Sequence, residues 1–171
     1  DDALRARQMQ EAEELLFSGP PKTGFAKALF RGEFRSDVIF PYPELPPAER
    51  AEVDEAVARV RVFAETEIDP AAIDRQADIP RSVVEGLSRL GVMGMTAPRE
   101  FGGRGFSQSA YCRVMEVIGG RCSSTAIFVN AHHSIGIRAL LLFGSPEQKA
   151  KGLPPLGRGE KLAALALAEK E

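Results

Sequence analysis

The sequence predicts an all-α fold, and three observations support this prediction. Apolar residues recur at helical spacing between Val53 and Ala64. The stretch 124–143, roughly 20 residues and so about 30 Å of helix, is apolar on nearly every side. The run Ser145-Pro146-Glu147-Gln148 marks a helix start, because it supplies a Ser cap, a Pro at the first helical position and the Gln of a capping box.

Residues 1–45 are predicted to form an N-terminal arm. Residues 3–17 have helical character, which ends at Ser18-Gly19-Pro20-Pro21. After a short apolar piece, the two prolines of Phe40-Pro41-Tyr42-Pro43 force an extended path.

Residues 46–160 are predicted to form the helical domain itself. A first helix starts at Pro46-Pro47 and is expected to close at Asp69-Pro70, and a second runs from Pro80 to Gly91, a C-terminal cap. A third starts at Ser107 and is expected to break at Gly119-Gly120. The helix over 124–143 is expected to be the most buried element, since an apolar surface all round is typical of a helix enclosed by neighbours.

Residues 161–168 are ambiguous on local pattern alone. Leu and Ala favour a helix, whereas the alternation of Leu165 and Leu167 allows a strand.

Composition argues for an ordinary soluble protein. The 171 residues are 44% hydrophobic and carry a formal net charge of −2, which gives no electrostatic reason to expect nucleic acid or an anionic membrane as a partner. The most apolar stretch is interrupted by Asn130, His132-His133 and Arg138, so a soluble protein is expected rather than a membrane span.

The residues that most often carry chemistry show no recognisable catalytic or metal pattern. His132 and His133 are adjacent, about 100° apart on a helix, and cannot chelate one metal as an i, i+4 pair would. We expect them to be packed or hydrogen-bonded, with a place beside a ligand pocket as the alternative. Cys112 and Cys122 are read as small core residues, and Gly102-Gly103-Arg104-Gly105 as a tight turn rather than a phosphate loop.

Three ordered motifs resemble the acyl-CoA dehydrogenase family. Residues 87–103 are similar to a helix ending in LG followed by P-x-E-x-GG, residues 131–136 to AHxSIG, and residues 142–149 to the start of GTxEQKxKYLPxLASGE. Upstream, residues 25–33 and 40–43 resemble the very-long-chain subgroup. The resemblance spans about residues 24 to 169.

The resemblance implies the N-terminal helical domain of a longer enzyme, with residues 161–171 as the start of a middle β-domain. Residues 161–168 are therefore expected to form a strand. The family uses FAD: a glutamate of its C-terminal domain removes the α-proton of a fatty acyl-CoA, and a hydride passes to the flavin to give trans-2-enoyl-CoA. No catalytic residue and no metal ligand is expected in this chain, which alone should be inactive.

The family's flavin-contacting strand implies cofactor-binding roles for Leu165, Leu167, Ala168 and Glu169. Two positions depart from the family pattern: Ala168 replaces a Thr, and Lys170 replaces a Pro. A lost neutral hydrogen bond is worth on the order of 1 kcal/mol, so weaker flavin binding is expected at that position.

Ile127, Ala131 and Ile135 are spaced i, i+4, i+8 and so share one helix face. The resemblance places the family's acyl-lining helix here and implies that these residues bind substrate, while packing in the bundle core is the alternative. The small Ala131 favours a long acyl chain.

Three functions stay open at this stage. The first is long-chain fatty acyl-CoA oxidation in β-oxidation, with an acceptor such as electron-transfer flavoprotein and a homo-oligomeric full-length form. The second is a flavin oxidase or monooxygenase on the same scaffold, and the third is a non-catalytic interaction or assembly module. Bacterial cytoplasm is the expected location, with the mitochondrial matrix as the alternative.

Overall fold

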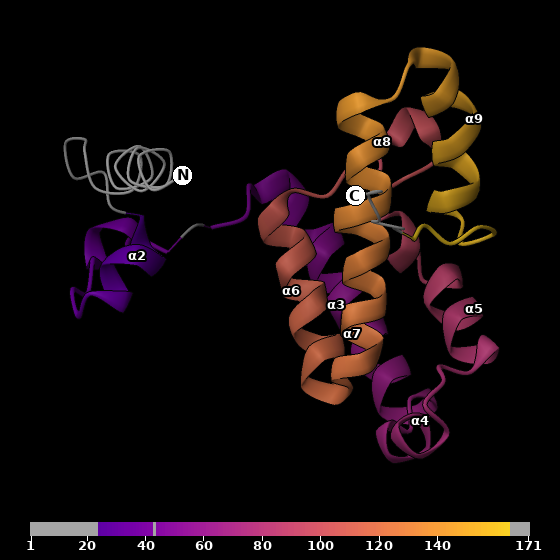
Figure 1. Cartoon of the computed structure of the whole chain (residues 1–171), viewed down its shortest axis with the longest axis horizontal. Helices are drawn as coiled ribbons and strands as arrows, with labels where there is room; N and C mark the ends of the chain where they lie inside the picture. Colours follow the sequence, from indigo (N-terminus) through magenta and orange to yellow (C-terminus); the bar gives the residue numbers. More distant parts are fainter. Residues whose placement is uncertain (1–23, 43, 165–171) are drawn as a thin grey trace, which may run out of the picture. The chain divides into compact units, whose positions relative to one another are not determined.

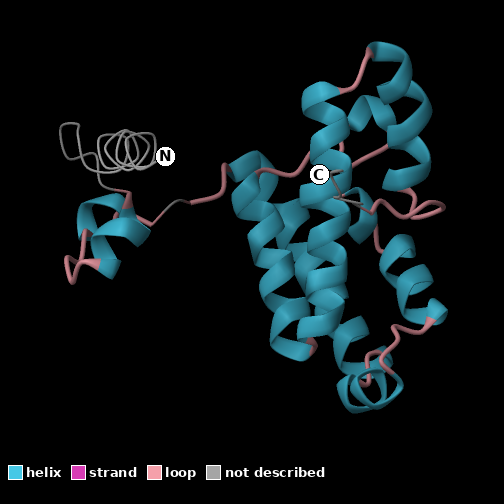
Figure 2. Cartoon of the chain, viewed as in Figure 1, coloured by secondary structure: helices cyan, strands magenta, loops and turns pink. Residues whose placement is uncertain are grey.

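The computed structural model describes residues 24–42 and 44–164. Within these ranges the chain forms helices and connecting loops, with no strand (Figure 2). The all-α prediction is therefore confirmed. The chain divides into two units between Pro43 and Glu44, and each is described by itself.

The described part of the first unit, residues 24–42, contains one short α-helix and one turn of 3-10 helix. These are α2 (Phe25–Phe30) and η1 (Ser36–Val38). The rings of Phe25 and Phe34 meet edge to face, with 5.9 Å between their centroids. The helical stretch expected over 3–17 lies outside the described residues.

The second unit is built around three neighbouring helices (Figure 1). Helix α3 (Pro47–Glu67) packs along α6 (Gln108–Arg121), and α6 packs along α7 (Ser123–Ala131). After α7 the helix continues as a π-helical turn, η4 (His132–Ile137), and then as α8 (Arg138–Phe143). We call the continuous run Ser123–Phe143 the central helix.

Helix α3 begins as its sequence predicts, with Pro47 at the first helical position. Its periodic apolar residues form one buried face: Val53, Ala56, Val60 and Ala64. The expectation that Asp69-Pro70 only closes this helix was incomplete. Asp69 also caps a further helix, α4 (Pro70–Gln76), because its carboxylate accepts the backbone N–H groups of Ala71 and Ala72 at 3.0 and 3.1 Å.

The C-terminal end of the next helix agrees with the sequence-based prediction, and that of α6 does not. Helix α5 (Arg81–Arg89) is followed by Gly91 in the left-handed conformation, at φ 74°, as a C-terminal cap requires. Helix α6 does not break at Gly119-Gly120 but continues to Arg121 and ends where Cys122 is extended. Packing along α3 and α7 outweighs the helix-weakening tendency of two glycines.

The last described helix, α9 (Pro146–Gly157), has the predicted capping box. The hydroxyl of Ser145 accepts the Gln148 backbone N–H at 3.3 Å, and the Gln148 side chain accepts the Ser145 N–H at 2.8 Å. Helix α9 packs against α8 and against the two short 3-10 helices η2 (Val92–Gly94) and η3 (Arg99–Phe101).

The buried side chains form one main core and one smaller cluster. The main core joins α3, α5, α6, α7 and the turn at residues 92–95. The smaller cluster joins Ala97, Ile137 of the central helix and Leu153 of α9. The central helix therefore takes part in both, with different residues along its length.

Candidate functional site

The central helix presents an apolar side that the described residues leave open. Ile127 is 68% exposed and Ile135 is 38% exposed, while Ala131 between them is partly buried. Toward the end of the helix, Leu142 and Phe143 are 57% and 85% exposed. Large side chains exposed in this way on one element are typical of an interaction surface.

The prediction that the central helix is the most buried element is wrong for the described structure. The three parts of this helix bury five of 21 residues: Thr125 and Val129 in α7, His132, His133 and Ile137 in η4, and none in α8. Helix α5, by comparison, buries three of its nine residues, Val83, Gly86 and Leu87. An apolar surface on all sides indicates that partners cover all sides, but the described helices cover only part of this one. The open side holds the three residues that the resemblance assigned to substrate, so these do not fill the core formed by the described helices.

The other side of the central helix is fixed by the histidine pair. Both rings are buried, at 1% and 2% exposure, and their centroids lie 5.6 Å apart. His133 Nε2 lies 2.8 Å from the Val92 carbonyl oxygen, and His132 Nε2 lies 3.1 Å from the Leu156 carbonyl oxygen. A carbonyl oxygen only accepts, so both rings carry their proton on Nε2 and each Nδ1 is an acceptor.

The two acceptor nitrogens are also used. The Thr96 hydroxyl donates to Nδ1 of His133 at 2.7 Å, and the backbone N–H of Ala163 donates to Nδ1 of His132 at 3.2 Å. Burial lowers the pKa of His132, and it lowers the pKa of His133 to about 4. The prediction of packed, hydrogen-bonded histidines is thus confirmed, and both rings are neutral.

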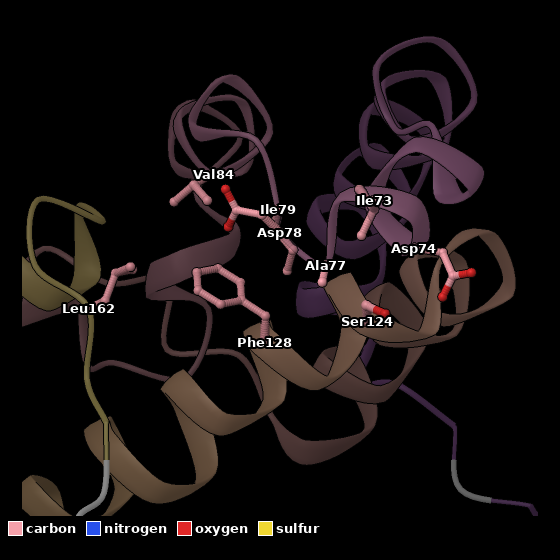
Figure 3. Close-up of a pocket in the computed structure, with 9 residues that line it drawn as sticks. All are labelled: Ile73, Asp74, Ala77, Asp78, Ile79, Val84, Ser124, Phe128 and Leu162. Atoms are coloured by element: carbon pink, nitrogen blue, oxygen red, sulfur yellow. The ribbon is translucent and has the colours of Figure 1, made fainter.

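A pocket of about 590 Å³ lies beside the central helix (Figure 3). The ring of Phe128 points toward it from α7, and Leu162 lies at one end. Its wall from α4, the loop after α4, and α5 includes Ile73, Ile79 and Val84, with the carboxylates of Asp74 and Asp78. Phe128 follows Ile127 by one residue, so the pocket borders a helix face about 100° away from the predicted substrate face.

The glycine-rich turn after η3 is structural, as the sequence indicated. Gly102 and Gly105 are both left-handed, at φ 80° and 60°. Arg104 in this turn donates to the Glu52 carboxylate of α3 at 3.2 and 3.3 Å, and Arg99 donates to it at 2.6 Å. The hydrogen bond from Arg99, then that from Arg104, lowers the pKa of Glu52. The guanidinium groups of Arg99 and Arg104 therefore hold this turn against α3.

The residues that the resemblance assigned to the flavin lie outside the described part of the chain. These are Leu165, Leu167, Ala168 and Glu169. The strand expected over 161–168 is described only as far as Ala164, and residues 162–164 are in neither helix nor strand. Ala163 contacts His132, and Gly136 lies against Ala163; neither contact was predicted from the sequence. The similarity to AHxSIG covers His132 and Gly136 but does not indicate their contact with Ala163.

Among residues 24–42 and 44–164, His, Cys, Asp and Glu form no group of three suited to a metal ion. Within the described part of the chain, one helix, Ser123–Phe143, is long and apolar enough to cross a membrane, and 22% of its most apolar 18-residue stretch is buried. Length and composition do not separate such a span from a helix that packs against protein.

Comparison with known proteins identifies the fold. The family model for the N-terminal domain of acyl-CoA dehydrogenases matches residues 50–160. The chain belongs to the acyl-CoA dehydrogenase family.

Individual relatives agree with this assignment. The chain is 40% identical over 169 residues to the mitochondrial very long-chain specific acyl-CoA dehydrogenase of Macaca fascicularis, covering 98% of this chain and 25% of that protein. It is 39% identical over 161 residues to the probable acyl-CoA dehydrogenase FadE10 of Mycobacterium tuberculosis, covering 94% of this chain and 24% of that one. The chain thus spans about a quarter of the length of these relatives.

A solved structure shows the same fold. The glutaryl-CoA dehydrogenase of Mycobacterium smegmatis, in complex with FADH2, superposes with a TM-score of 0.59 at 27% identity, covering 69% of this chain and 30% of that one.

Proposed function

We propose that this chain is the N-terminal helical part of a longer FAD-dependent acyl-CoA dehydrogenase that oxidises long-chain fatty acyl-CoA to trans-2-enoyl-CoA. Membership of the family and the very long-chain relative support the reaction and the substrate class. Within the proposed enzyme, residues 1–45 are the arm, 46–160 the helical domain and 161–171 the start of the middle domain.

The open apolar side of the central helix is the observation that carries the proposal. Ile127, Ala131 and Ile135 offer an apolar strip, and pockets for small molecules are lined mainly by such side chains. In the proposed enzyme the acyl chain lies along this strip. Ala131, the smallest of the three, leaves depth for a long chain.

The proposed cofactor is FAD, which supplies the hydride acceptor when bound. The residues expected to contact it, Leu165, Leu167, Ala168 and Glu169, follow the last described residue. The fit of this chain to FAD therefore rests on the family. Its own proposed contribution is to bind and orient the acyl chain.

The proposed partners follow from the same reaction. The substrate is a fatty acyl-CoA, and the electron acceptor is a protein such as electron-transfer flavoprotein. The full-length form is proposed to be a homo-oligomer in the bacterial cytoplasm, with the mitochondrial matrix as the alternative, since the relatives include a protein named as mitochondrial and a mycobacterial one.

The substitution Ala131→Phe in the complete enzyme tests the role of the central helix. A phenyl group on the open side fills the channel, so kcat/KM should fall by roughly tenfold or more for long acyl-CoAs and little for short ones, as expected when pocket shape sets substrate choice. The measurement is a series of kcat/KM values over acyl chain length.

Ala126→Phe is the matched control, since it makes the same change on the same helix. Ala126 packs against the main core and faces Gly119 of α6, so enlarging it overpacks the core. This variant should lower stability and affect all chain lengths alike. If Ala131→Phe behaves in the same way, Ala131 belongs to a packed interior and the proposed channel is wrong.

A further inference from the structure

The chain after α9 returns to the middle of the central helix at Ala163 (Figure 1). There the backbone N–H of Ala163 donates to Nδ1 of His132 at 3.2 Å. The same ring donates from Nε2 to the Leu156 carbonyl oxygen at 3.1 Å. One buried side chain thus joins the end of α9, the central helix and the segment that follows α9.

The absence of a side chain at Gly136 leaves the space that Ala163 needs to approach His132. A Cβ atom placed on Gly136 would lie 1.9 Å from the Cβ of Ala163 and 3.3 Å from its Cα. Real Cβ atoms do not approach other atoms as closely as 1.9 Å, so any other residue at position 136 would displace the segment. The conformation of Gly136 is ordinary for a helix, and the glycine is needed here for close approach rather than for backbone freedom.

His132 and Gly136 both belong to the π-helical turn, η4. Such single π-turns break the regular α-helical register and are frequent at functional sites. His133, which follows His132, holds the same turn to Val92 of η2 and to Thr96 in the loop after η2. The π-turn is therefore held by contacts of both histidines. It offers Ala163 a hydrogen-bond acceptor, Nδ1 of His132, and space above Gly136, which has no side chain.

We propose that His132 and Gly136 are positioning residues that dock the backbone of Ala163 onto the π-turn and so set the point from which the following segment leaves the helical domain. Leu165, the first residue expected to contact the flavin, follows Ala163 by two residues. The consequence for the flavin rests on the proposed function; the docking itself does not.

Two substitutions of His132 separate its two hydrogen bonds. His132→Asn keeps an acceptor near the place of Nδ1 but is too short to reach Leu156, while His132→Gln keeps a donor near the place of Nε2. We expect the amide of Ala163, followed by NMR-detected hydrogen exchange in this chain, to exchange roughly fivefold faster in the Gln variant, as loss of one neutral hydrogen bond implies. The Asn variant should stay close to the wild type.

Equal exchange at Ala163 in both variants would overturn the role of His132, because the ring would then act only by filling space. An Ala163 amide that exchanges in the wild type as fast as an open chain would overturn the docking altogether.

A steric exchange tests Gly136 independently. Gly136→Ala should displace Ala163 and speed the exchange of its amide, and adding Ala163→Gly should restore most of the protection by removing the opposing Cβ atom. Gly120→Ala is the control, because a Cβ at that helical glycine meets nothing within 4 Å. A double variant no better protected than Gly136→Ala alone would contradict the proposal.

In the complete protein the same variants report on the cofactor. Gly136→Ala should weaken flavin binding, measured as the flavin retained after dialysis, and Ala163→Gly should restore it. Unchanged retention in Gly136→Ala, with wild-type flavin binding intact, would overturn the positioning role while leaving the proposed function standing. A complete wild-type protein that binds no flavin would overturn the proposed function, and the docking would then be decided by the amide exchange.

Discussion

The hydroxyl of Thr96 lies 2.7 Å from Nδ1 of His133, joining the loop after η2 to the π-turn of the central helix. The ring also donates from Nε2 to Val92 and lies edge to face with Tyr111, at 5.4 Å between centroids. Burial of the ring disfavours its charged form and so lowers the pKa of His133. Protonation would put a hydrogen on Nδ1, and the Thr96 hydroxyl could no longer donate to it.

The first prediction concerns stability against pH. The folded pKa of His133 is about 4, below the ordinary value of 6.5, so between these values the unfolded chain binds more protons than the folded one. The free energy of unfolding should therefore fall as pH falls from about 6.5 toward 4, by on the order of 3 kcal/mol from this group. Urea unfolding of the wild type across this range measures the fall.

The control is His133→Gln, measured over the same pH range. Carboxylates such as Glu52 also destabilise at low pH, and the neighbouring His132 shifts in the same direction as His133, so the informative quantity is the difference between the two proteins. The variant should be less stable at pH 7 but lose less stability on acidification. Parallel curves would show that His133 does not titrate in this way.

The second prediction concerns the ion pairs of Glu52. Arg104 is the more buried partner, with 24% of its side chain exposed against 67% for Arg99. It also donates to the Leu90 carbonyl oxygen and stacks over the Phe106 ring at 4.4 Å. Arg104→Ala should therefore lower the free energy of unfolding by about 1–2 kcal/mol, more than Arg99→Ala.

The matched control for this pair of variants is Arg81→Ala. Arg81 pairs with Glu85 one turn along α5, but its side chain is 91% exposed. Such a surface pair is worth about 0.3–0.5 kcal/mol. A loss in Arg104→Ala no larger than in Arg81→Ala would show that the turn is not held to α3 by these contacts.

The third prediction concerns Thr125 of α7. Its hydroxyl is fully buried and, within the described structure, has no hydrogen-bond partner. Thr125→Val replaces that hydroxyl by a methyl group of similar size, so it should raise the free energy of unfolding by about 1 kcal/mol. Thermal or urea unfolding measures the change.

Thr125→Ser separates the effect of the hydroxyl from that of the buried methyl group. It keeps the unpaired hydroxyl and removes a buried methyl group, so it should destabilise. If Val destabilises as well, the hydroxyl has a partner in solution.

The sequence predicted helix boundaries well where local chemistry sets them. The capping box at Ser145 and the left-handed Gly91 follow from a few neighbouring residues, and both are present. Asp69-Pro70 is also typical of a helix start, with Asp as the cap and Pro at the first helical position. Helix α4 was not predicted because this pair was interpreted only as the end of α3.

Features set by packing between distant residues were not predictable. Gly119 and Gly120 stay helical because neighbouring helices hold α6, and the π-turn at His132 depends on contacts to residues 92, 96, 156 and 163. The open side of the central helix was missed for a related reason, since apolar periodicity reports what a helix buries but not which partner covers it. The positions of Ile127, Ala131 and Ile135 on one side followed from spacing alone.

We propose above that this helical chain serves a longer flavoenzyme that oxidises acyl-CoA. The most direct measurement is palmitoyl-CoA-dependent dye reduction, with the flavin absorbance recorded, for the 171-residue chain and for the longer polypeptide that contains it. We expect a flavin band and dye reduction from the longer polypeptide and neither from the chain alone, since a cofactor of this size needs several converging elements around it. A folded longer polypeptide without flavin or dye reduction, or a chain that alone shows both, would contradict the claim.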